Sequence, residues 1–240
     1  MQMTSRIFIL TGAGVSAESG LGTFRDKDGL WTKVNLADVA TPEGFARNPK
    51  LVLDFYNARR ANMVTASPNA AHAALARLEL ACEASGRGLV LVTQNVDDLH
   101  EQAGSKNVVH MHGELRKIRC ERCGVVVRWD DPVTLDTRCP GCTRAGHLRP
   151  HVVWFGEMPF EMDAIFASLD QADLFVSIGT SGSVYPAAAF VSQARLRKVR
   201  TVELNLEPSE NADAFDEKLY GPASVVVPSF VDQLTGGPGW

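Results

Sequence analysis

Short apolar runs, each followed by small or polar residues, recur along the chain and predict the strands of a parallel sheet. These runs cover residues 6–11, 89–93, 107–111, 151–155, 173–178 and 201–204. Runs of four to eight apolar residues are typical of strands that are buried on both faces. A further apolar run at 225–228 predicts a last strand, which would be followed by a terminal helix over 230–234.

Helical patterns lie between these runs. Residues 38–63 predict two helices, with Thr41 and Pro42 typical of a helix start and Pro49 opening the second helix. Residues 68–80 predict a third helix, and the polar stretch 98–104, which ends in glycine, fits one or two helical turns. Strands that alternate with helices predict an α/β fold.

Composition narrows the class of protein. The chain has 240 residues, 45% hydrophobic and 22% charged, which is typical of a globular protein with a sizeable core. A net charge of -4 argues against a dedicated nucleic-acid binder. The densest basic run is interpreted as a solvated helix face, with a local binding patch as the alternative; it comprises Arg195, Arg197, Lys198 and Arg200.

The start of the chain lacks the pattern of a signal peptide, and no stretch reaches about 18 consecutive apolar residues, so we expect a cytoplasmic protein. Four of the five cysteines form two CxxC pairs, Cys120 with Cys123 and Cys139 with Cys142. Two such thiolate pairs on glycine-containing turns predict one structural zinc ion with four sulfur ligands. A redox function is the alternative, but neither pair opens a helix after a strand.

Polar side chains follow two of the predicted strands. Gln94, Asn95 and Asp97 come after one strand, and His112 comes after the next. Because open α/β sheets bind ligands at the carboxyl ends of their strands, these groups predict a site.

The first strand leads into Gly12-Ala13-Gly14, which matches a dinucleotide-binding fingerprint. A tight turn without a ligand is the alternative. Residues 18–31 contain three glycines and a run of charges, which predicts a loop beside a phosphate site.

Three motifs occur together and in order: GAGVSAESGLGTFRDKDGLW at 12–31, TQNVDDLH with HMHGEL at 93–115, and the paired CxxC. This combination resembles the sirtuins, which are NAD-dependent protein lysine deacylases. GTSGSVYPAA from Gly179 and NLEPS from Asn205 are similar to nucleotide-binding loops of that family, so the resemblance covers almost the whole chain.

The resemblance implies a Rossmann-like parallel sheet with helices on both faces, a smaller zinc-binding domain and a helical insert. Residues 1–36, 69–115 and 149–240 would form the Rossmann-like domain, residues 37–68 the helical insert and residues 116–148 the zinc module. The expected activity is transfer of an acyl group from lysine to ADP-ribose, with release of nicotinamide.

Residue roles follow from the same resemblance. His112 would be the general base and Asn95 a second catalytic residue. The expected NAD contacts are Gly12, Ala13, Gly14, Glu18, Phe24, Arg25, Gln94, Asn95, Asp97, Gly179, Thr180, Ser181, Asn205, Glu207 and Ala223. The family pattern selects His112 over His110, because alternate residues of a strand face the same way and their spacing cannot separate them.

Tyr56 and Arg59 lie three residues apart on one helix face. By themselves they are interpreted as a core tyrosine and a solvent-exposed arginine. The resemblance implies instead that they recognise acidic acyl groups such as succinyl and malonyl, in a pocket widened by Ala40. The peptide would bind as an added strand beside Val153, Phe155, Gly156, Glu157, Gly182 and Val184.

Other functions remain open on the sequence. His110, His112 and Asp97 could bind a metal in a hydrolase, the zinc insert could serve an NAD-sensing module without catalysis, and ADP-ribose could be transferred to protein. We expect acylated-lysine proteins or peptides as partners, a monomeric state, and neither nucleic acid nor membrane as a partner.

Overall fold

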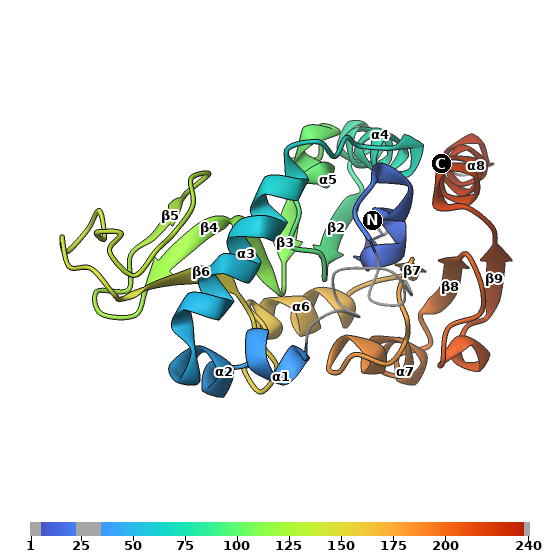
Figure 1. Ribbon diagram of the computed structural model, residues 1–240. Helices are drawn as coiled ribbons and strands as arrows, with labels where there is room; N and C mark the ends of the chain where they lie inside the picture. Colours follow the sequence, from blue (N-terminus) through green and yellow to red (C-terminus); the bar gives the residue numbers. More distant parts are fainter. Residues whose placement is uncertain (1–5, 23–34, 238–240) are drawn as a thin grey trace.

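The computed structural model describes residues 6–22 and 35–237, and within them the chain forms two sheets and a set of helices (Figure 1). The strands are β1 (Arg6–Thr11), β2 (Gly88–Thr93), β3 (Val108–His110), β4 (Gly113–Cys120), β5 (Val126–Arg128), β6 (Leu148–Val152), β7 (Leu174–Ile178), β8 (Arg200–Asn205) and β9 (Glu217–Tyr220). The α-helices are α1 (Leu36–Val39), α2 (Pro42–Arg47), α3 (Pro49–Met63), α4 (Ala70–Ala84), α5 (Leu99–Gln102), α6 (Met162–Leu169), α7 (Phe190–Leu196) and α8 (Ala223–Gly236). Short 3-10 turns are η1 (Ala13–Val15), η2 (Ala17–Ser19), η4 (Ala187–Ala189) and η5 (Ala212–Ala214).

The larger sheet has the strand order β3-β2-β1-β7-β8-β9, and every neighbouring pair is parallel. This is the order of a Rossmann-like sheet, so the expected fold class is confirmed. The strands β1, β2 and β3 form one half of the sheet, and β7, β8 and β9 form the other half. The strand order therefore reverses between the neighbouring strands β1 and β7. Ligands of open α/β sheets bind at such a point, outside the carboxyl ends of the strands.

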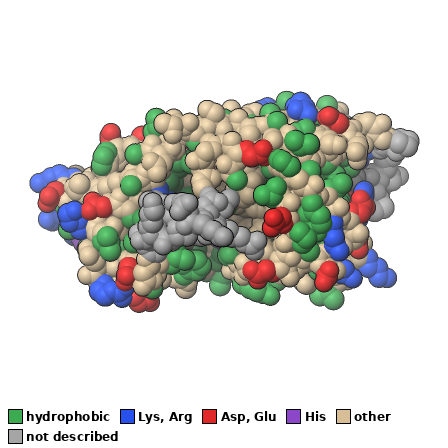
Figure 2. All heavy atoms as spheres, turned by 45° about the vertical axis from the view of Figure 1, so that its right-hand side comes forward, with side chains coloured by type: hydrophobic (Ala, Val, Ile, Leu, Met, Phe, Trp, Pro, Cys, Tyr) green, Lys and Arg blue, Asp and Glu red, His purple; other side chains and the backbone are tan. Residues whose placement is uncertain are grey.

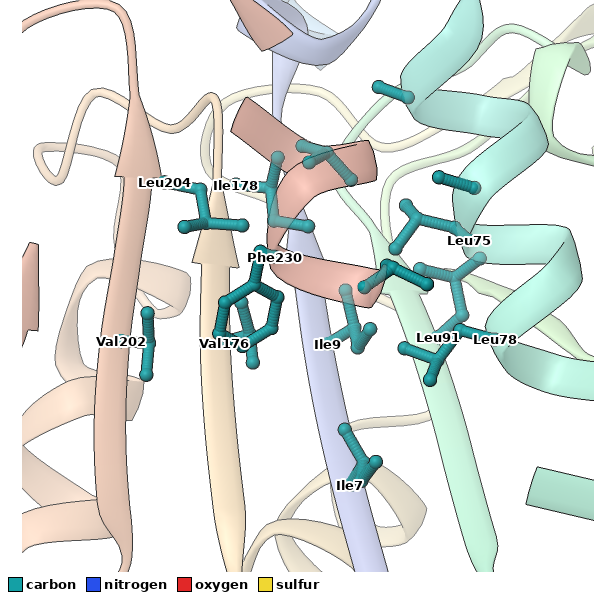
Figure 3. Close-up of a cluster of buried hydrophobic side chains, with 14 of the residues drawn as sticks. Ile7, Ile9, Leu75, Leu78, Leu91, Val176, Ile178, Val202, Leu204 and Phe230 are labelled. Carbon is teal, nitrogen blue, oxygen red and sulfur yellow. The ribbon is translucent and has the colours of Figure 1, made fainter. Parts of the chain in front are cut away.

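Alternate residues of each central strand fill two hydrophobic cores, because successive side chains of a strand point to opposite faces. Ile7 and Ile9 of β1 pack in the core that contains Leu75 of α4 and Phe230 of α8 (Figure 3). On the other face, the core combines Phe8 and Leu10 with side chains of α6 and α7. The sheet is therefore a central layer with helices on both sides (Figure 1).

The smaller sheet is antiparallel, with the order β5-β4-β6. Helix α3 packs against it, with Leu53 in one cluster with Ile118 and Leu148. The buried Arg60 adds a polar contact, since its Nε donates to the carbonyl of Leu115 at 3.0 Å. The helical insert and the small sheet are thus joined.

The sequence-based strand prediction was wrong at two places. The strand expected at 151–155 begins earlier, as β6, and pairs with β4 in the small sheet rather than joining the large one. The strand expected at 225–228 is helical and belongs to α8, which has Pro228 inside it. The last strand is instead β9, whose four residues are all exposed. An apolar run of this length does not distinguish a strand from a helix segment.

The surface mixes both signs of charge, and Figure 2 shows acidic and basic side chains interspersed over the face that it draws. In the basic run, Arg197 pairs with Asp170 at 2.9 Å and Arg200 with Glu217 at 2.7 Å. These pairings agree with a solvated surface rather than a free cationic patch. Within residues 6–22 and 35–237, no helix combines the length and apolar character that a membrane span requires.

Candidate active site

Two neighbouring strands deliver the polar cluster. Strand β2 ends at Thr93 and is followed by Gln94, Asn95 and Asp97, while the parallel β3 ends at His110. The backbone N–H of Gln94 continues the pairing by donating to the carbonyl of Thr11 at 2.9 Å. The carboxyl ends of β1, β2 and β3 therefore meet at one edge, as expected from the sequence.

Asn95 and Asp97 are buried and joined by a serine hydroxyl. Asn95 Nδ2 donates to Ser16 Oγ at 3.0 Å, and Ser16 Oγ donates to Asp97 Oδ2 at 3.2 Å. Burial raises the pKa of Asp97, whereas the backbone N–H of Leu99 and the Ser16 hydroxyl act in the opposite direction. Ser16 was not among the residues expected from the sequence, because nothing in the glycine-turn pattern assigns it a partner.

His112 and His110 differ in their contacts. His112 Nδ1 donates to the carbonyl of Gln94 at 3.0 Å, which fixes the tautomer with the lone pair on Nε2. Burial lowers the pKa of His112, although this hydrogen bond opposes the shift. An imidazole that is neutral at pH 7 with a fixed lone pair can accept a proton, so His112 can serve as a general base.

His110 has an acceptor near each ring nitrogen. Its Nε2 lies 2.6 Å from Glu101 Oε1, and its Nδ1 lies 3.4 Å from the carbonyl of Asn95. Burial alone would lower the pKa of His110, but the hydrogen bond and charge of Glu101 raise it above its ordinary value. Because both ring nitrogens face acceptors, the contacts favour His112 as the base.

The four cysteines fit a zinc ion. Their Sγ atoms lie within 4.8 Å of one another, with Cys120 to Cys142 at 3.8 Å and Cys123 to Cys139 at 3.6 Å. Zn–S bonds of about 2.3 Å in a tetrahedron place sulfur atoms about 3.8 Å apart. Among the residues that the structure describes, no other group of three His, Cys, Asp or Glu side chains is placed to share a metal. The geometry therefore gives no support to a metal site at His110, His112 and Asp97.

The glycine turn lies at the crossover point of the sheet. Gly12 N donates to the carbonyl of Ile178 at 2.9 Å, and Gly14 N donates to the carbonyl of Gly179 at 2.8 Å. A Cβ on Gly14 would lie 2.7 Å from the Cα of Gly179, so the two loops touch through backbone. The turn continues as the short η1 and η2, not as an α-helix, and ends at Gly20 with φ +85°. Open α/β sheets bind dinucleotides at a glycine turn in this position, at the carboxyl ends of the strands where the strand order reverses.

The outer nucleotide-binding candidates also gather at this edge. Glu18 accepts hydrogen bonds from the backbone N–H and hydroxyl of Ser224, at 2.9 and 2.7 Å, which fixes the start of α8 at Ala223. Asn205 Nδ2 donates to the carbonyl of Thr180 at 2.8 Å, and Ser181 Oγ lies 2.7 Å from Ser183 Oγ. Glu207 is exposed. Phe24 and Arg25, two further candidates, lie outside the described residues.

Tyr56 and Arg59 lie on α3 beside the small sheet. Tyr56 is buried and the Arg59 guanidinium lies 5.6 Å from its ring centroid, while Ala40 is buried in the same cluster. Burial lowers the pKa of Arg59, and the nearby Tyr56 and Asp97 side chains oppose this shift. The structure confirms Tyr56 as a core residue and gives Arg59 an intermediate exposure, not a fully solvated position.

The expected peptide-binding segments contain turns and bends and are partly exposed. Val153 N donates to the carbonyl of His112 and Phe155 N to the carbonyl of Ala40, each at 2.9 Å. The Phe155 side chain is 51% exposed and that of Val184 is 38% exposed, so both offer apolar surface. Gly156 and Gly182 have positive φ, +90° and +72°. Glu157 differs, since its carboxylate binds Arg149 at 2.8 and 2.9 Å.

Comparison with known proteins agrees with this geometry. The Sir2 family profile matches residues 12–186. A Caulobacter vibrioides protein named NAD-dependent protein deacylase is 63% identical over 236 residues, covering 98% of each chain. A solved complex of a Sir2 homologue with NAD is 38% identical, with a TM-score of 0.86 over 98% of this chain and 91% of that one. A Sir2 structure bound to acetylated peptide is 28% identical, with a TM-score of 0.79 over 98% and 94%.

Proposed function

This chain belongs to the Sir2 family, and we propose that it is an NAD-dependent protein lysine deacylase that removes both acetyl and acidic acyl groups. NAD is the co-substrate, and the products are the free lysine, nicotinamide and O-acyl-ADP-ribose. The similarity to the deacylase of Caulobacter vibrioides extends over 98% of both chains, which supports an activity of the same kind.

The observation that carries the proposal is the pairing of His112 with Gln94 at the crossover edge of the sheet. The hydrogen bond leaves Nε2 of His112 as the proton acceptor, and the lowered pKa keeps the ring neutral. Within the described residues, no hydrogen bond occupies that nitrogen. We assign His112 the role of general base on a ribose hydroxyl, and Asn95 the role of binding ribose beside it.

The nucleotide site combines the glycine turn with three further loops. Residues 12–14 and 179–181 would line the phosphates, with Arg25 as a charged contact, and Phe24 would shield the reactive carbon from water. Asn205, Glu207 and Ala223 would line the adenosine part of the NAD site. Glu18 would hold the segment at Ala223 in place through its hydrogen bonds with Ser224. Asp97, whose raised pKa reflects burial, would bind the amide of nicotinamide.

The acyl pocket contains Ala40, Tyr56 and Arg59. A guanidinium and a phenol can hold a distal carboxylate by charge-assisted hydrogen bonds, which a neutral acetyl group cannot accept at that position. The small side chain of Ala40 leaves room for the longer acyl chain. The peptide would add as a strand through backbone hydrogen bonds, beside Val153, Phe155, Gly156, Glu157, Gly182 and Val184.

The zinc ion would be structural, because its four cysteines leave no open coordination position. We propose the division into a Rossmann-like domain of three segments (1–36, 69–115 and 149–240), a helical insert (37–68) and a zinc module (116–148). Reduced CxxC pairs that hold zinc are typical of cytoplasmic proteins, and we propose that location and a monomeric state.

The test is a paired assay of one lysine peptide, acetylated and succinylated, with and without NAD, following nicotinamide release. We expect both peptides to turn over only with NAD. Arg59→Met should lose mainly the succinyl reaction, while Arg77→Met, which removes an exposed arginine paired with Asp232, should change neither. Turnover without NAD would contradict the mechanism, and equal losses on both peptides would make Arg59 structural. ADP-ribose attached to protein would instead indicate a transferase.

A further inference from the structure

The hydroxyl group of Tyr56 accepts a hydrogen bond from an indole. Trp154 Nε1 donates to the Tyr56 oxygen at 3.0 Å, and the Arg59 guanidinium lies 5.6 Å from the centroid of the Tyr56 ring. An indole N–H can only donate, so it occupies a lone pair of the phenol oxygen. Burial raises the pKa of Tyr56, so the phenol keeps its proton at neutral pH. That proton therefore has to find an acceptor elsewhere.

Within the described residues, the Tyr56 hydroxyl accepts from Trp154 but makes no hydrogen bond in which it is the donor. Tyr56 is 3% exposed and Trp154 is 2% exposed, so water does not surround this hydroxyl freely. A buried donor without a partner costs free energy, and a ligand carboxylate at this point would supply the missing acceptor. A neutral acetyl group has no oxygen at the distal position and cannot do so.

Trp154 is itself held from two sides. The guanidinium carbon of Arg149 lies 3.2 Å from the centroid of its ring. Arg149 makes two hydrogen bonds with the Glu157 carboxylate, and Glu157 Oε2 accepts the backbone N–H of Trp154 at 2.8 Å. This closed set of contacts fixes both the ring and the backbone of Trp154. Fixed in this way, the indole N–H can direct a hydroxyl without reorienting.

We propose that Trp154 is a positioning residue for acidic acyl substrates: its indole N–H orients the Tyr56 hydroxyl so that the Tyr56 proton is donated to the distal carboxylate of the acyl group. The inference rests on the proposed function and adds a specificity-determining residue to it. Trp154 acts only through Tyr56, and its effect is confined to substrates that carry a distal acceptor.

The first variant is Trp154→Phe, which keeps an aromatic ring beneath Arg149 and removes the N–H. KM and kcat are measured for the succinylated and acetylated forms of one peptide at saturating NAD. We expect KM for the succinylated peptide to rise about five- to tenfold, as for the loss of one hydrogen bond. Both constants for the acetylated peptide should stay within about twofold. Trp129→Phe is the matched control, because the buried Nε1 of Trp129 has no hydrogen-bond partner within the described residues.

A double-mutant cycle tests whether Trp154 acts through the hydroxyl. Tyr56→Phe removes the group that the indole is proposed to orient. Adding Trp154→Phe to Tyr56→Phe should then leave KM for the succinylated peptide unchanged. If Trp154→Phe fails to fold, benzothienylalanine at position 154 replaces the N–H by sulfur and preserves the ring shape. The same rise in KM is expected for it.

The results separate the inference from the proposed function. Equal effects of Trp154→Phe on both peptides, or an undiminished effect in the Tyr56→Phe background, would overturn the inference and leave the deacylase assignment intact. A wild-type protein that releases nicotinamide with the acetylated but not the succinylated peptide would show that acidic acyl recognition fails, and the inference would fail with it. A wild-type protein inactive on both peptides would refute the deacylase function itself.

Discussion

Replacing Arg149 by methionine tests how much the buried ion pair stabilises the protein. The Arg149 side chain is 2% exposed, and its partner Glu157 is 20% exposed. Methionine keeps much of the aliphatic volume but removes the charge, both hydrogen bonds to Glu157 and the contact with the face of Trp154. Glu157 then keeps the Trp154 backbone N–H and Arg119, whose Nη2 lies 3.1 Å away.

The expected loss in free energy of unfolding follows from the Glu157 charge that remains without its main partner. Removing one partner of a buried ion pair costs about 3–5 kcal/mol, because the other charge stays buried without compensation. Since Arg119 still faces Glu157, we expect a loss of free energy of unfolding near the lower end, about 3 kcal/mol. In a protein of this size, that corresponds to a fall in the melting temperature of about 6–12 °C.

Arg200→Met provides the matched control, because Arg200 also binds a glutamate through two nitrogens but lies at the surface. Side chains of Arg200 and Glu217 are 51% and 48% exposed, and an exposed pair contributes about 0.2–1 kcal/mol. We expect its melting temperature to fall by no more than about 4 °C. Thermal unfolding with zinc present measures both variants. Equally small shifts in the melting temperatures of both variants, or a stabilised Arg149→Met protein, would refute the stabilisation that we assign to the Arg149–Glu157 pair.

Three further predictions concern the site. Because burial lowers the pKa of His112 and the base must be neutral, kcat/KM should stay level near neutrality and fall only as pH drops through a value below 6.5, as a pH profile measures. Cys120→Ser, or a strong chelator, should release the zinc and lower the melting temperature, as metal analysis and thermal unfolding measure. Gly14→Ala places a Cβ 2.7 Å from the Cα of Gly179 and should raise KM for NAD about tenfold or more in a titration of NAD.

Each of these has its own control. An acidic limb with a midpoint above 6.5 would contradict the role assigned to His112. Cys82→Ser changes a buried cysteine outside the zinc cluster, so it should leave the metal content unchanged; loss of zinc there would contradict the four-cysteine site. Gly236→Ala adds a Cβ with nothing within 4 Å and should leave KM for NAD unchanged. An unchanged KM in Gly14→Ala would show that the two loops can separate without cost.

Local sequence patterns were sufficient to predict much of the fold and the polar cluster at the carboxyl ends of the strands. The central strands are continuous apolar runs, and parallel strands that are covered on both faces require that composition. Gln94, Asn95 and Asp97 directly follow one such strand and His112 follows another, so their meeting is a consequence of strand order. Two CxxC pairs predict the four sulfur ligands by spacing alone, because tetrahedral zinc needs two turns of this type.

Other features depend on partners far away in the sequence. Strand β9 consists of exposed residues, among them Glu217 and Tyr220, and is stabilised by pairing with β8 and by the bond from Tyr220 to Glu203. The apolar run at 225–228 forms part of a helix because α8 packs against α4. No local pattern contains these contacts.

The sequence by itself determined the parallel sheet, the zinc ligands and the set of polar groups at the strand ends, because each depends on residues close together in the chain. Only the tertiary structure decided which histidine has a lowered pKa, through the burial of His112, and which has a raised pKa, through Glu101 beside His110. It also decided that an arginine on a strand is buried against a tryptophan ring, and that this tryptophan reaches Tyr56, 98 residues away in sequence. The charge state and orientation of a buried group depend on which dipoles the fold brings to it, and those come from distant segments.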